Sequence, residues 1–449
     1  MKYLMPIISL LLIILFIIIN KSLAYAFIIS SLLSILYFII IQKYDLKVII
    51  NYYIKGIINN RIIFPIILSI GAIVSVWLGS GIVPTLIYYG FDFVKLKFIY
   101  VIAFVFSSIV SIFMGTALGT ISTVGLAIIG IGLGFGVDFN ILLGAIISGS
   151  FIADKISPIS GLFNLLLVSS KTKYKKVLNQ MKKTLIPVYI ITFIFFLILD
   201  LTKKVKIENV EKILEYKKLI INNFIISPYF LLIPLIVIVL PFFKLETIKS
   251  LLIGIFSGSI LMFVFQKLSI LKILKIIFIG YNSKTNTILD TILKSGGVIS
   301  MVEVIIIVAG ALGLINLFEE VGLLDDFNKI ALKNINDKYT LKNRTSIVSM
   351  FLTIVSCDQT LGIILPIKIF KDKFKEFNLK KEELARIISD TGVVIAPLMP
   401  WNVNVIIISS IFGLTDYRFI YYIALCYLFP VLNLITNTIK KISLRKDTY

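Results

Sequence analysis

The stretch SGSFIADKISPISGLFN (residues 148–164) interrupts an apolar chain with an acid, a lysine and a proline. A second stretch, SDTGVVIAPLMPWNVN (residues 389–404), repeats the order acid, proline, asparagine. Proline lacks the N–H that continues a helix, and its ring clashes with the preceding turn. Each stretch therefore predicts a helix that is broken in mid-membrane, where freed backbone groups lie beside Ser, Asn and Asp oxygens.

The sequence around these stretches is that of a membrane protein. Of the 449 residues, 58% are hydrophobic and 15% are charged, and the mean hydropathy is +1.01. Apolar runs of about 20 residues, enough to cross about 30 Å of hydrocarbon, recur along the chain. We expect an all-α polytopic membrane protein with about 11 to 13 transmembrane or half-spanning helices and no sizeable soluble domain.

A second polar stretch lies upstream of each break, at residues 115–123 and at residues 356–360. Interruptions in matching places predict two inverted repeats with broken helices or re-entrant hairpins, and a binding site at the repeat interface. We expect N-terminal spans and a basic loop (1–61), a first transporter repeat (62–220), a second transporter repeat (221–436) and a basic cytoplasmic tail (437–449).

The net charge of +21 comes from 45 basic and 24 acidic residues. Many of the basic residues lie in short loops at residues 171–183 and 368–386 and in the tail at 440–446. Short basic loops beside spans are typical of the cytoplasmic face, so we place these three inside and expect no nucleic-acid partner. The mixed-charge segment 203–218 conflicts with this rule. Either the intervening span is a hairpin, or positive charge is a poor guide there.

Absent residues exclude several classes of protein. The chain has no histidine, which removes His-ligated metal sites, Ser-His and Cys-His catalysis and a histidine proton relay. No phosphate-binding loop is present, and Gly130, Gly132, Gly134 and Gly136 lack the dinucleotide spacing. We expect no enzyme, no cofactor and no disulfide between Cys357 and Cys426. The N-terminus resembles a signal peptide, but another apolar span follows at once, so we expect it to remain uncleaved.

The acids inside the apolar segments are the candidate functional residues. Each costs roughly 2.5 to 3.5 kcal/mol at bilayer depth, so acids kept there are functional by default. We predict that an ion or proton is bound by carboxylate, hydroxyl and amide groups of Asp154, Ser157, Asn164, Asp358, Asp390, Thr391 and Asn402. Lys155 is either an internal counter-ion or a side chain that extends to the interface.

Four of these stretches together resemble the NhaC family of Na+/H+ antiporters, within the ion transporter superfamily. They are GTALGTISTVG (115–125), GAIISGSFIADKISPIS (144–160), CDQTLGIILP (357–366) and ISDTGVVIAPLMPWN (388–402). A weaker similarity runs from about residue 62 to residue 430. The resemblance implies an antiporter of the inner membrane that exchanges Na+ for H+, and some relatives exchange malate and lactate instead.

The chain departs from the family pattern at the first break. Where the family has Ser-Asp-Thr-Thr-Asn, residues 160–164 read Ser-Gly-Leu-Phe-Asn, so Gly161 stands in place of an acid. Glu303 lies in an apolar span at a place where the family resemblance does not predict an acid. We consider it a candidate extra acid that compensates for the loss.

The sequence therefore predicts a secondary active transporter in the cytoplasmic membrane of a bacterium, which exchanges Na+ for H+ by alternating access. Na+ would lie at the ion-binding residues named above, and membrane lipid would surround the chain, with a homodimer left open. Exchange of organic acids is the alternative, since Lys155 would suit a substrate carboxylate. A passive Na+ channel and an intramembrane aspartyl hydrolase are further readings. The hydrolase lacks its Gly-x-Gly-Asp setting, which residues 134–138 miss by one position.

Overall fold

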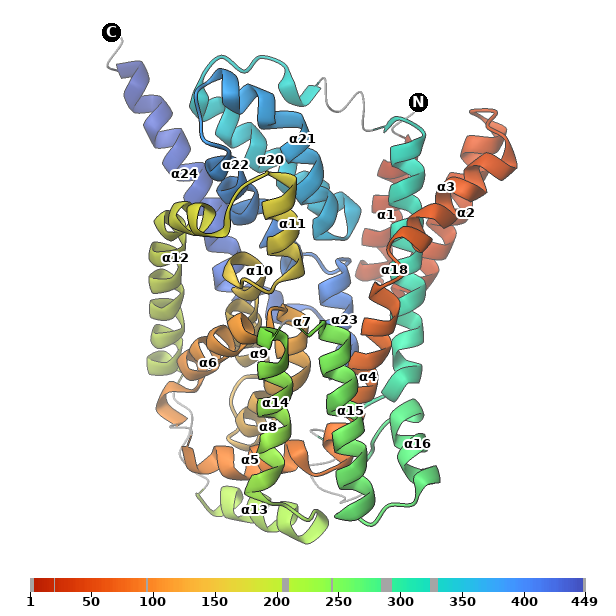
Figure 1. Ribbon diagram of the computed structural model, residues 1–449, viewed down its shortest axis with the longest axis vertical. Helices are drawn as coiled ribbons and strands as arrows, with labels where there is room; N and C mark the ends of the chain where they lie inside the picture. Colours follow the sequence, from red (N-terminus) through yellow and green to blue (C-terminus); the bar gives the residue numbers. More distant parts are fainter. Residues whose placement is uncertain are drawn as a thin grey trace.

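The computed structural model describes residues 4–19, 21–93, 96–203, 210–243, 245–283, 293–323 and 330–446. Within these ranges the chain is helical, and its only β pairing is an isolated bridge between Asn282 and Lys294 (Figure 1). The all-α, polytopic membrane fold predicted from composition is confirmed.

Several helices precede the first break in the described part of the chain. They are α1 (Leu4–Ile18), α2 (Leu23–Ile40), α3 (Leu46–Asn59), α4 (Ile63–Gly79), α5 (Ile82–Phe93), α6 (Ile99–Met114), α7 (Ala117–Thr120), the π-helical η2 (Ile121–Gly125) and α8 (Leu126–Gly134). The break itself comprises α9 (Phe139–Ser150), α10 (Ala153–Ile156) and α11 (Gly161–Ser169), and α12 (Tyr174–Thr202) follows.

A connecting region leads to the second half. It contains α13 (Val210–Asn223), α14 (Leu232–Val239), α15 (Thr247–Val264), α16 (Ile270–Ile279) and α18 (Gly297–Glu320). The second half contains α20 (Lys338–Ser356), α21 (Gln359–Glu376), α22 (Lys381–Ile388), the π-helical η5 (Ser389–Val393), the 3-10 turn η6 (Ala396–Leu398), α23 (Val403–Phe412) and α24 (Ala424–Lys446).

Seven helical segments among the described residues are long and apolar enough to cross a membrane, or up to nine if two bent pairs each count as one span. They are Leu23–Ile40, Ala117–Gly134, Phe139–Ser169, Tyr174–Thr202, Thr247–Val264, Gly297–Glu320 and Lys381–Phe412. Shorter apolar helices such as α1 and α6 add to these. The sequence expectation of 11 to 13 included half-spanning segments of that kind.

The two halves share one order of elements. In each, a helix ends at a left-handed residue, Gly115 (φ 72°) after α6 and Cys357 (φ 58°) after α20. The next residue, Thr116 or Asp358, is extended and caps the following helix. A broken helix and then a long helix with an internal proline, α12 or α24, complete each half. In Figure 1, α12 descends while α24 rises toward the C-terminus, as an inverted pair would.

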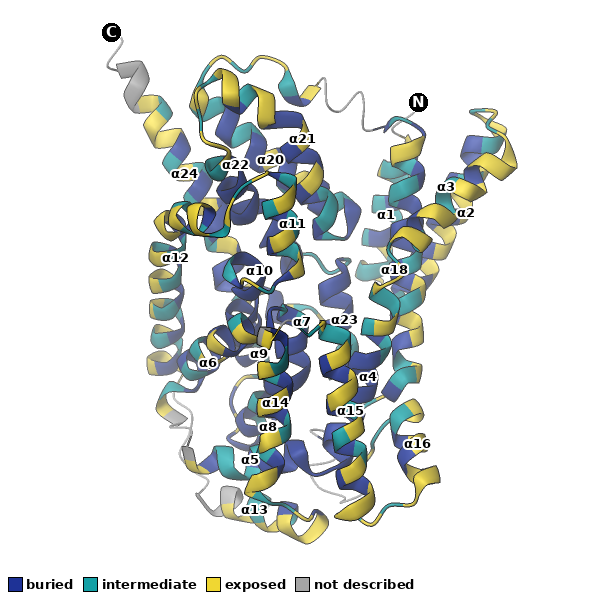
Figure 2. Cartoon of the chain, in the orientation of Figure 1, coloured by how far each residue is buried: buried dark blue, intermediate teal, exposed yellow. Residues whose placement is uncertain are grey.

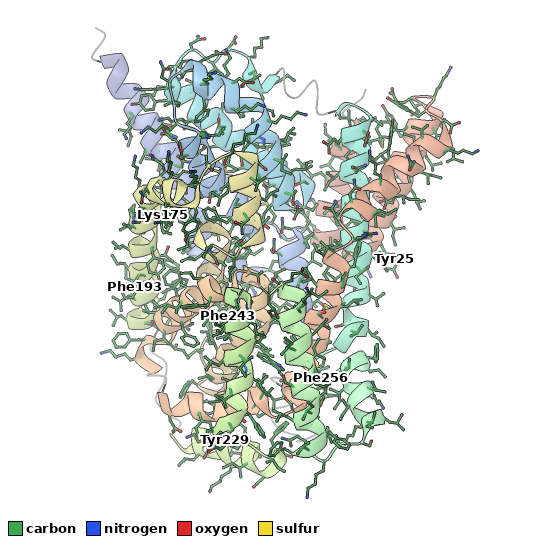
Figure 3. All side chains as sticks on the ribbon, in the orientation of Figure 1. Tyr25, Lys175, Phe193, Tyr229, Phe243 and Phe256 are labelled. Carbon is green, nitrogen blue, oxygen red and sulfur yellow. The ribbon has the colours of Figure 1, made fainter. Side chains whose placement is uncertain are left out.

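The broken segments lie inside the molecule, and the long straight helices lie outside. In both Phe139–Ser169 and Lys381–Phe412, 83% of the most apolar window is buried, against 28% in α12 and in α15 (Figure 2). Large apolar side chains such as Tyr25, Tyr229 and Phe256 point away from the ribbon (Figure 3). The outer helices thus present an apolar surface to lipid, and the protein itself surrounds the breaks.

The three basic segments gather at one end of the molecule. The loop before α12, the loop between α21 and α22 and the end of α24 all lie at the upper end of Figure 1, whereas α13 lies at the lower end. Because α12 is a single continuous helix of 29 residues, it is not a hairpin. Positive charge is therefore a poor guide for segment 203–218, because its described residues in α13 lie at the far end from the other basic loops.

Candidate functional site

The first break places Asp154 in a buried turn. α10 begins at Ala153 and ends at Ile156, Ser157 is extended, and Pro158 prevents the helix from continuing. The Ser157 hydroxyl donates to the Ile112 carbonyl of α6 at 2.6 Å, which ties the break to its neighbour. Asp154 is only 6% exposed, and its carboxylate accepts a hydrogen bond from the Ser160 hydroxyl at 3.3 Å. Among the described residues it makes no ion pair.

The second break brings Asp390 against cations from both halves. One carboxylate oxygen accepts from the Lys155 ammonium and from the Thr184 hydroxyl, the latter at 3.1 Å. The other oxygen accepts from Arg386 at 2.7 Å, one helical turn earlier. Lys155 and Asp390 are fully buried, and the ring of Phe429 lies 3.9 Å from the Lys155 nitrogen. Lys155 is therefore an internal counter-ion of Asp390, and it does not extend to the interface.

A chain of alternating charges continues from this cluster. Glu383 lies 4.0 Å from Arg386 and 2.7 Å from Lys342 of α20. The side chain of Glu383 is 23% exposed, so the charges run from the fully buried pair toward the surface. Each buried charge thus has an opposite neighbour, which is the arrangement that a low-dielectric interior requires. Within the described ranges two buried acids are exceptions: Asp154, and Asp200, whose carboxylate accepts from the backbone amides of Tyr100 and Val101.

The second break also positions a group of amides. The Asn402 side chain caps α23, because its oxygen accepts from the Asn404 backbone at 3.0 Å. The Asn404 amide donates to Gln359 at 3.1 Å, and the Gln359 amide donates to the Val393 carbonyl at 2.8 Å. The break freed that carbonyl from the helix ladder. The Asn402 amide nitrogen is buried, and no described residue accepts a hydrogen bond from it.

Asp358 occupies a separate position. It caps α21 by accepting from the Thr360 backbone at 2.8 Å. It also lines a cavity of about 80 Å³ between the α20–α21 junction and α18. The polar residues that share the cavity are Asn60, Asn316, Glu319, Ser356 and Thr360. Asp358 therefore faces α18, whereas Asp390 faces Lys155 and Arg386.

The remaining predicted residues divide between the inside and the outside. The Thr391 hydroxyl is buried and donates to the Ile387 carbonyl at 2.7 Å. Asn164 is exposed, and its amide donates to the Pro158 carbonyl at 3.1 Å, so the structure does not bring it to Asp390. Glu303 accepts from Ser22 and lines a different cavity, whose lining includes none of the three aspartates.

Sequence reasoning missed four residues of the site: Thr184, Gln359, Arg386 and Asn404. Arg386 was assigned to a cytoplasmic basic loop, although its position four residues before Asp390 on a helix was a signal for pairing. Gln359 and Asn404 lie next to predicted residues, and their amides carried the same polar signal. Thr184 had no local signal, because it is one hydroxyl in a long apolar helix.

The fold and the site define a polytopic α-helical membrane protein with two broken spans, whose buried ionisable groups come from both halves of the chain. Residues 161–437 match the model of the Na+/H+ antiporter family. The chain is 30% identical to the malate-2H+/Na+-lactate antiporter of Bacillus subtilis over 84% of its length and 81% of the relative.

Two further relatives carry the NhaC name. The Na+/H+ antiporter NhaC of Alkalihalophilus pseudofirmus is 28% identical over 82% of this chain and 80% of the relative. NhaC of Bacillus subtilis is 27% identical over 86% of each. The chain belongs to the Na+/H+ antiporter family, and its resemblance to NhaC is confirmed.

Proposed function

We propose that the protein exchanges Na+ for H+ across the cytoplasmic membrane of a bacterium by alternating access. The observation that carries this proposal is Asp154, a buried carboxyl group without a counter-ion among the described residues. An ionised carboxylate in such a place is strongly unfavourable unless a cation accompanies it. Asp154 thus holds either a proton or a cation, which is the competition that an exchanger needs.

The charges around Asp390 support the role of Asp154. Lys155 and Arg386 already neutralise Asp390, and both of its oxygens have donors. Asp390 is therefore already neutralised, which leaves Asp154 as the carboxylate that exchanges its proton for a cation. Because the proton and Na+ compete for this one carboxyl group, the release of the proton is coupled to the binding of Na+.

The arrangement of the halves supports alternating access. Lys155 comes from the first break, and Asp390 and Arg386 come from the second. A site that two inverted repeats share is exposed to one side or the other as the repeats rock against their surroundings. Ser157, Thr391 and Asn402 line the same breaks and supply neutral oxygens for the ion.

The test is exchange by the purified chain in liposomes that carry a pH-sensitive dye and have an acidic interior. External Na+ should make the lumen alkaline, and Asp154→Asn should abolish that response because the exchanging carboxyl group is gone. Asp138→Asn is the matched control, since Asp138 caps α9 at its exposed end and asparagine caps equally well. Unchanged exchange by Asp154→Asn would refute the assignment.

The same assay separates the alternative. Malate and lactate are added in place of Na+, because one relative is named as a malate-2H+/Na+-lactate antiporter. A response that requires either acid would assign organic-acid exchange. A Na+ current that persists without proton movement would identify a channel.

A further inference from the structure

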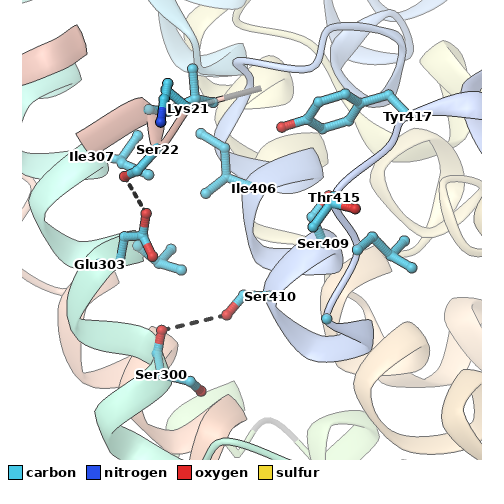
Figure 4. Close-up of a pocket in the computed structure, with 14 residues that line it drawn as sticks. Lys21, Ser22, Ser300, Glu303, Ile307, Ile406, Ser409, Ser410, Thr415 and Tyr417 are labelled. Carbon is cyan, nitrogen blue, oxygen red and sulfur yellow. Dashed lines mark hydrogen bonds between the residues drawn. The ribbon is translucent and has the colours of Figure 1, made fainter. Parts of the chain in front are cut away.

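A second polar cavity lies away from the central breaks. Its volume is about 420 Å³, and it lies between α18 and the C-terminal end of α23, beside the turn between α1 and α2 (Figure 4). Among the described residues Glu303 is the one carboxylate in its lining, and Ser22, Ser300, Ser409 and Ser410 line it too. The cavity therefore offers one anionic group and several neutral oxygens.

Glu303 is an acid within a membrane-spanning helix. It is the seventh of the 24 residues of α18, and Ile299, Val302 and Ile306 on the same face are exposed. The Ser22 hydroxyl donates to its carboxylate, and within the described ranges Glu303 makes no ion pair. Lys21 lines the same cavity without forming one. The Glu303 side chain is exposed where it lines the cavity, and an ionisable group within a membrane-spanning helix is a candidate ion ligand by default, so a mobile cation is the partner that it lacks.

Ser409 provides an independent sign of a ligand. It is 8% exposed, it lines the cavity, and its hydroxyl has no hydrogen-bond partner in the described part of the chain. A buried hydroxyl without a partner costs about 1 to 3 kcal/mol, which a bound ion or its water would offset. The last turn of α23, which Gly413 terminates, adds the negative end of the helix dipole.

We infer that this cavity is a second cation site, which takes a hydrated monovalent cation with Glu303 as its charged ligand and Ser409 as a neutral one. The cavity of about 420 Å³ has room for several water molecules, because each water occupies about 30 Å³. A cation bound there therefore keeps part of its water. α23 spans about 15 Å from this cavity to Asn402 at the central break. The inference rests on the proposed function only in the choice of Na+ as the probe.

The experiment measures equilibrium binding of radioactive Na+ to the purified chain, with Asp154→Asn as the background that removes the central carboxylate. This background should still bind Na+. Adding Glu303→Gln should weaken binding about tenfold or more, as the loss of a charged ligand does. Adding Glu303→Asp should preserve most of it. Glu320→Gln in the same background is the matched control, because Glu320 is on α18 but pairs with Lys55.

Ser409→Ala separates a ligand from a structural residue. Removing an unpartnered hydroxyl should leave the thermal unfolding midpoint unchanged or higher, while Na+ binding weakens. Equal binding with and without Glu303→Gln, no binding in the Asp154→Asn background, or equal loss in the Glu320→Gln control would overturn the inference. A wild-type chain that moves no protons on Na+, while its Asp154→Asn form still binds Na+ through Glu303, would refute the proposed exchange and leave this site standing.

Discussion

Asp390 receives three donors from three different elements, and this makes it the most constrained side chain of the site. Lys155 comes from α10, Thr184 from α12 and Arg386 from α22. Desolvation of so many charges is costly, so the cluster is weak evidence for stability. The geometry of the cluster instead places Asp390, from the second half of the chain, against Lys155, which directly follows Asp154 in the sequence.

Removing one partner of the Lys155–Asp390 pair should lower the unfolding free energy more than removing both partners does. Asp390→Asn leaves Lys155 and Arg386 buried without their anion, and should lower the unfolding free energy by about 3 to 5 kcal/mol. Adding Lys155→Met should recover part of that loss, because one uncompensated charge is gone. Chemical unfolding of the single and double variants in detergent measures both effects. Simple additivity of the two losses would contradict the pairing.

Gly161 is the position at which the chain lacks the acid of the family. A Cβ added there meets nothing within 4 Å, and Gly161 is the first residue of α11. Gly161→Ala should therefore stabilise the protein by about 0.5 to 1 kcal/mol, because alanine lowers the conformational entropy of the unfolded chain. The thermal unfolding midpoint reports it.

Gly115→Ala is the matched comparison for that substitution. Gly115 has φ 72°, and a Cβ there would lie 2.6 Å from Ile159. The substitution should destabilise the protein by more than about 1 kcal/mol. If the substitution at position 115 stabilises the protein, or the one at position 161 destabilises it, the local backbone differs from the one described.

At the scale of elements, four helices in or upstream of the breaks begin with a polar cap. Thr116, Ser160, Asp358 and Asn402 each accept from a backbone amide two or three residues later. These same residues lie in the stretches that the sequence singled out. Capping accounts for part of their polarity, so a polar residue at a break has a structural role even where it has a functional one.

Asp337 caps α20 at the end of the molecule and gives a pH-dependent test. Burial alone would raise its pKa, but hydrogen bonds from the Thr340 hydroxyl and backbone, with Lys441 nearby, hold the pKa below its usual 3.8. Its stabilising effect is present above the unfolded pKa and is lost as pH falls through the lower folded value.

Asp337→Ala should therefore lower the unfolding free energy by about 1 kcal/mol at neutral pH, as loss of an N-cap does. The difference from wild type should shrink only at pH values below about 4. Thermal unfolding at a series of pH values checks this. A difference that stays constant down to pH 2 would rule out the charge of Asp337 as its source.

At the scale of the whole molecule, the grouping of basic loops implies an orientation. The loop before α12 and the loop after α21 lie at one end, and α13 lies at the other (Figure 1). Lys173 and Lys375 are exposed in or beside the first two loops, and Lys218 is exposed on α13. The native Cys357 and Cys426 are buried, so their background reactivity with a maleimide should be low.

Membrane-impermeant maleimide should therefore label Lys173→Cys and Lys375→Cys from the cytoplasmic side, and Lys218→Cys from the opposite side. Inside-out and right-side-out vesicles make the comparison, with unsubstituted protein as the control. Labelling of all three from one side would contradict the single crossing by α12.

The helical membrane fold and both breaks were predictable from the sequence, because hydropathy and proline act locally. The prolines and polar residues that break each helix lie within residues 148–164 and 389–404 themselves. The repeated order of elements was visible as matching interruptions, although the repeat boundaries at 62, 221 and 436 remain predictions.

The membrane environment, the two breaks and the identity of the candidate acids were determined by the sequence itself, since they depend on residues close together in the chain. Only the tertiary structure decided that Lys155 pairs with Asp390, that Thr184 and Arg386 join them, that Asp154 has no charged partner among the described residues and that Asn164 is exposed. These contacts join residues up to 235 positions apart. Which residues pair depends on how the two halves pack against each other, and local sequence patterns do not predict that packing.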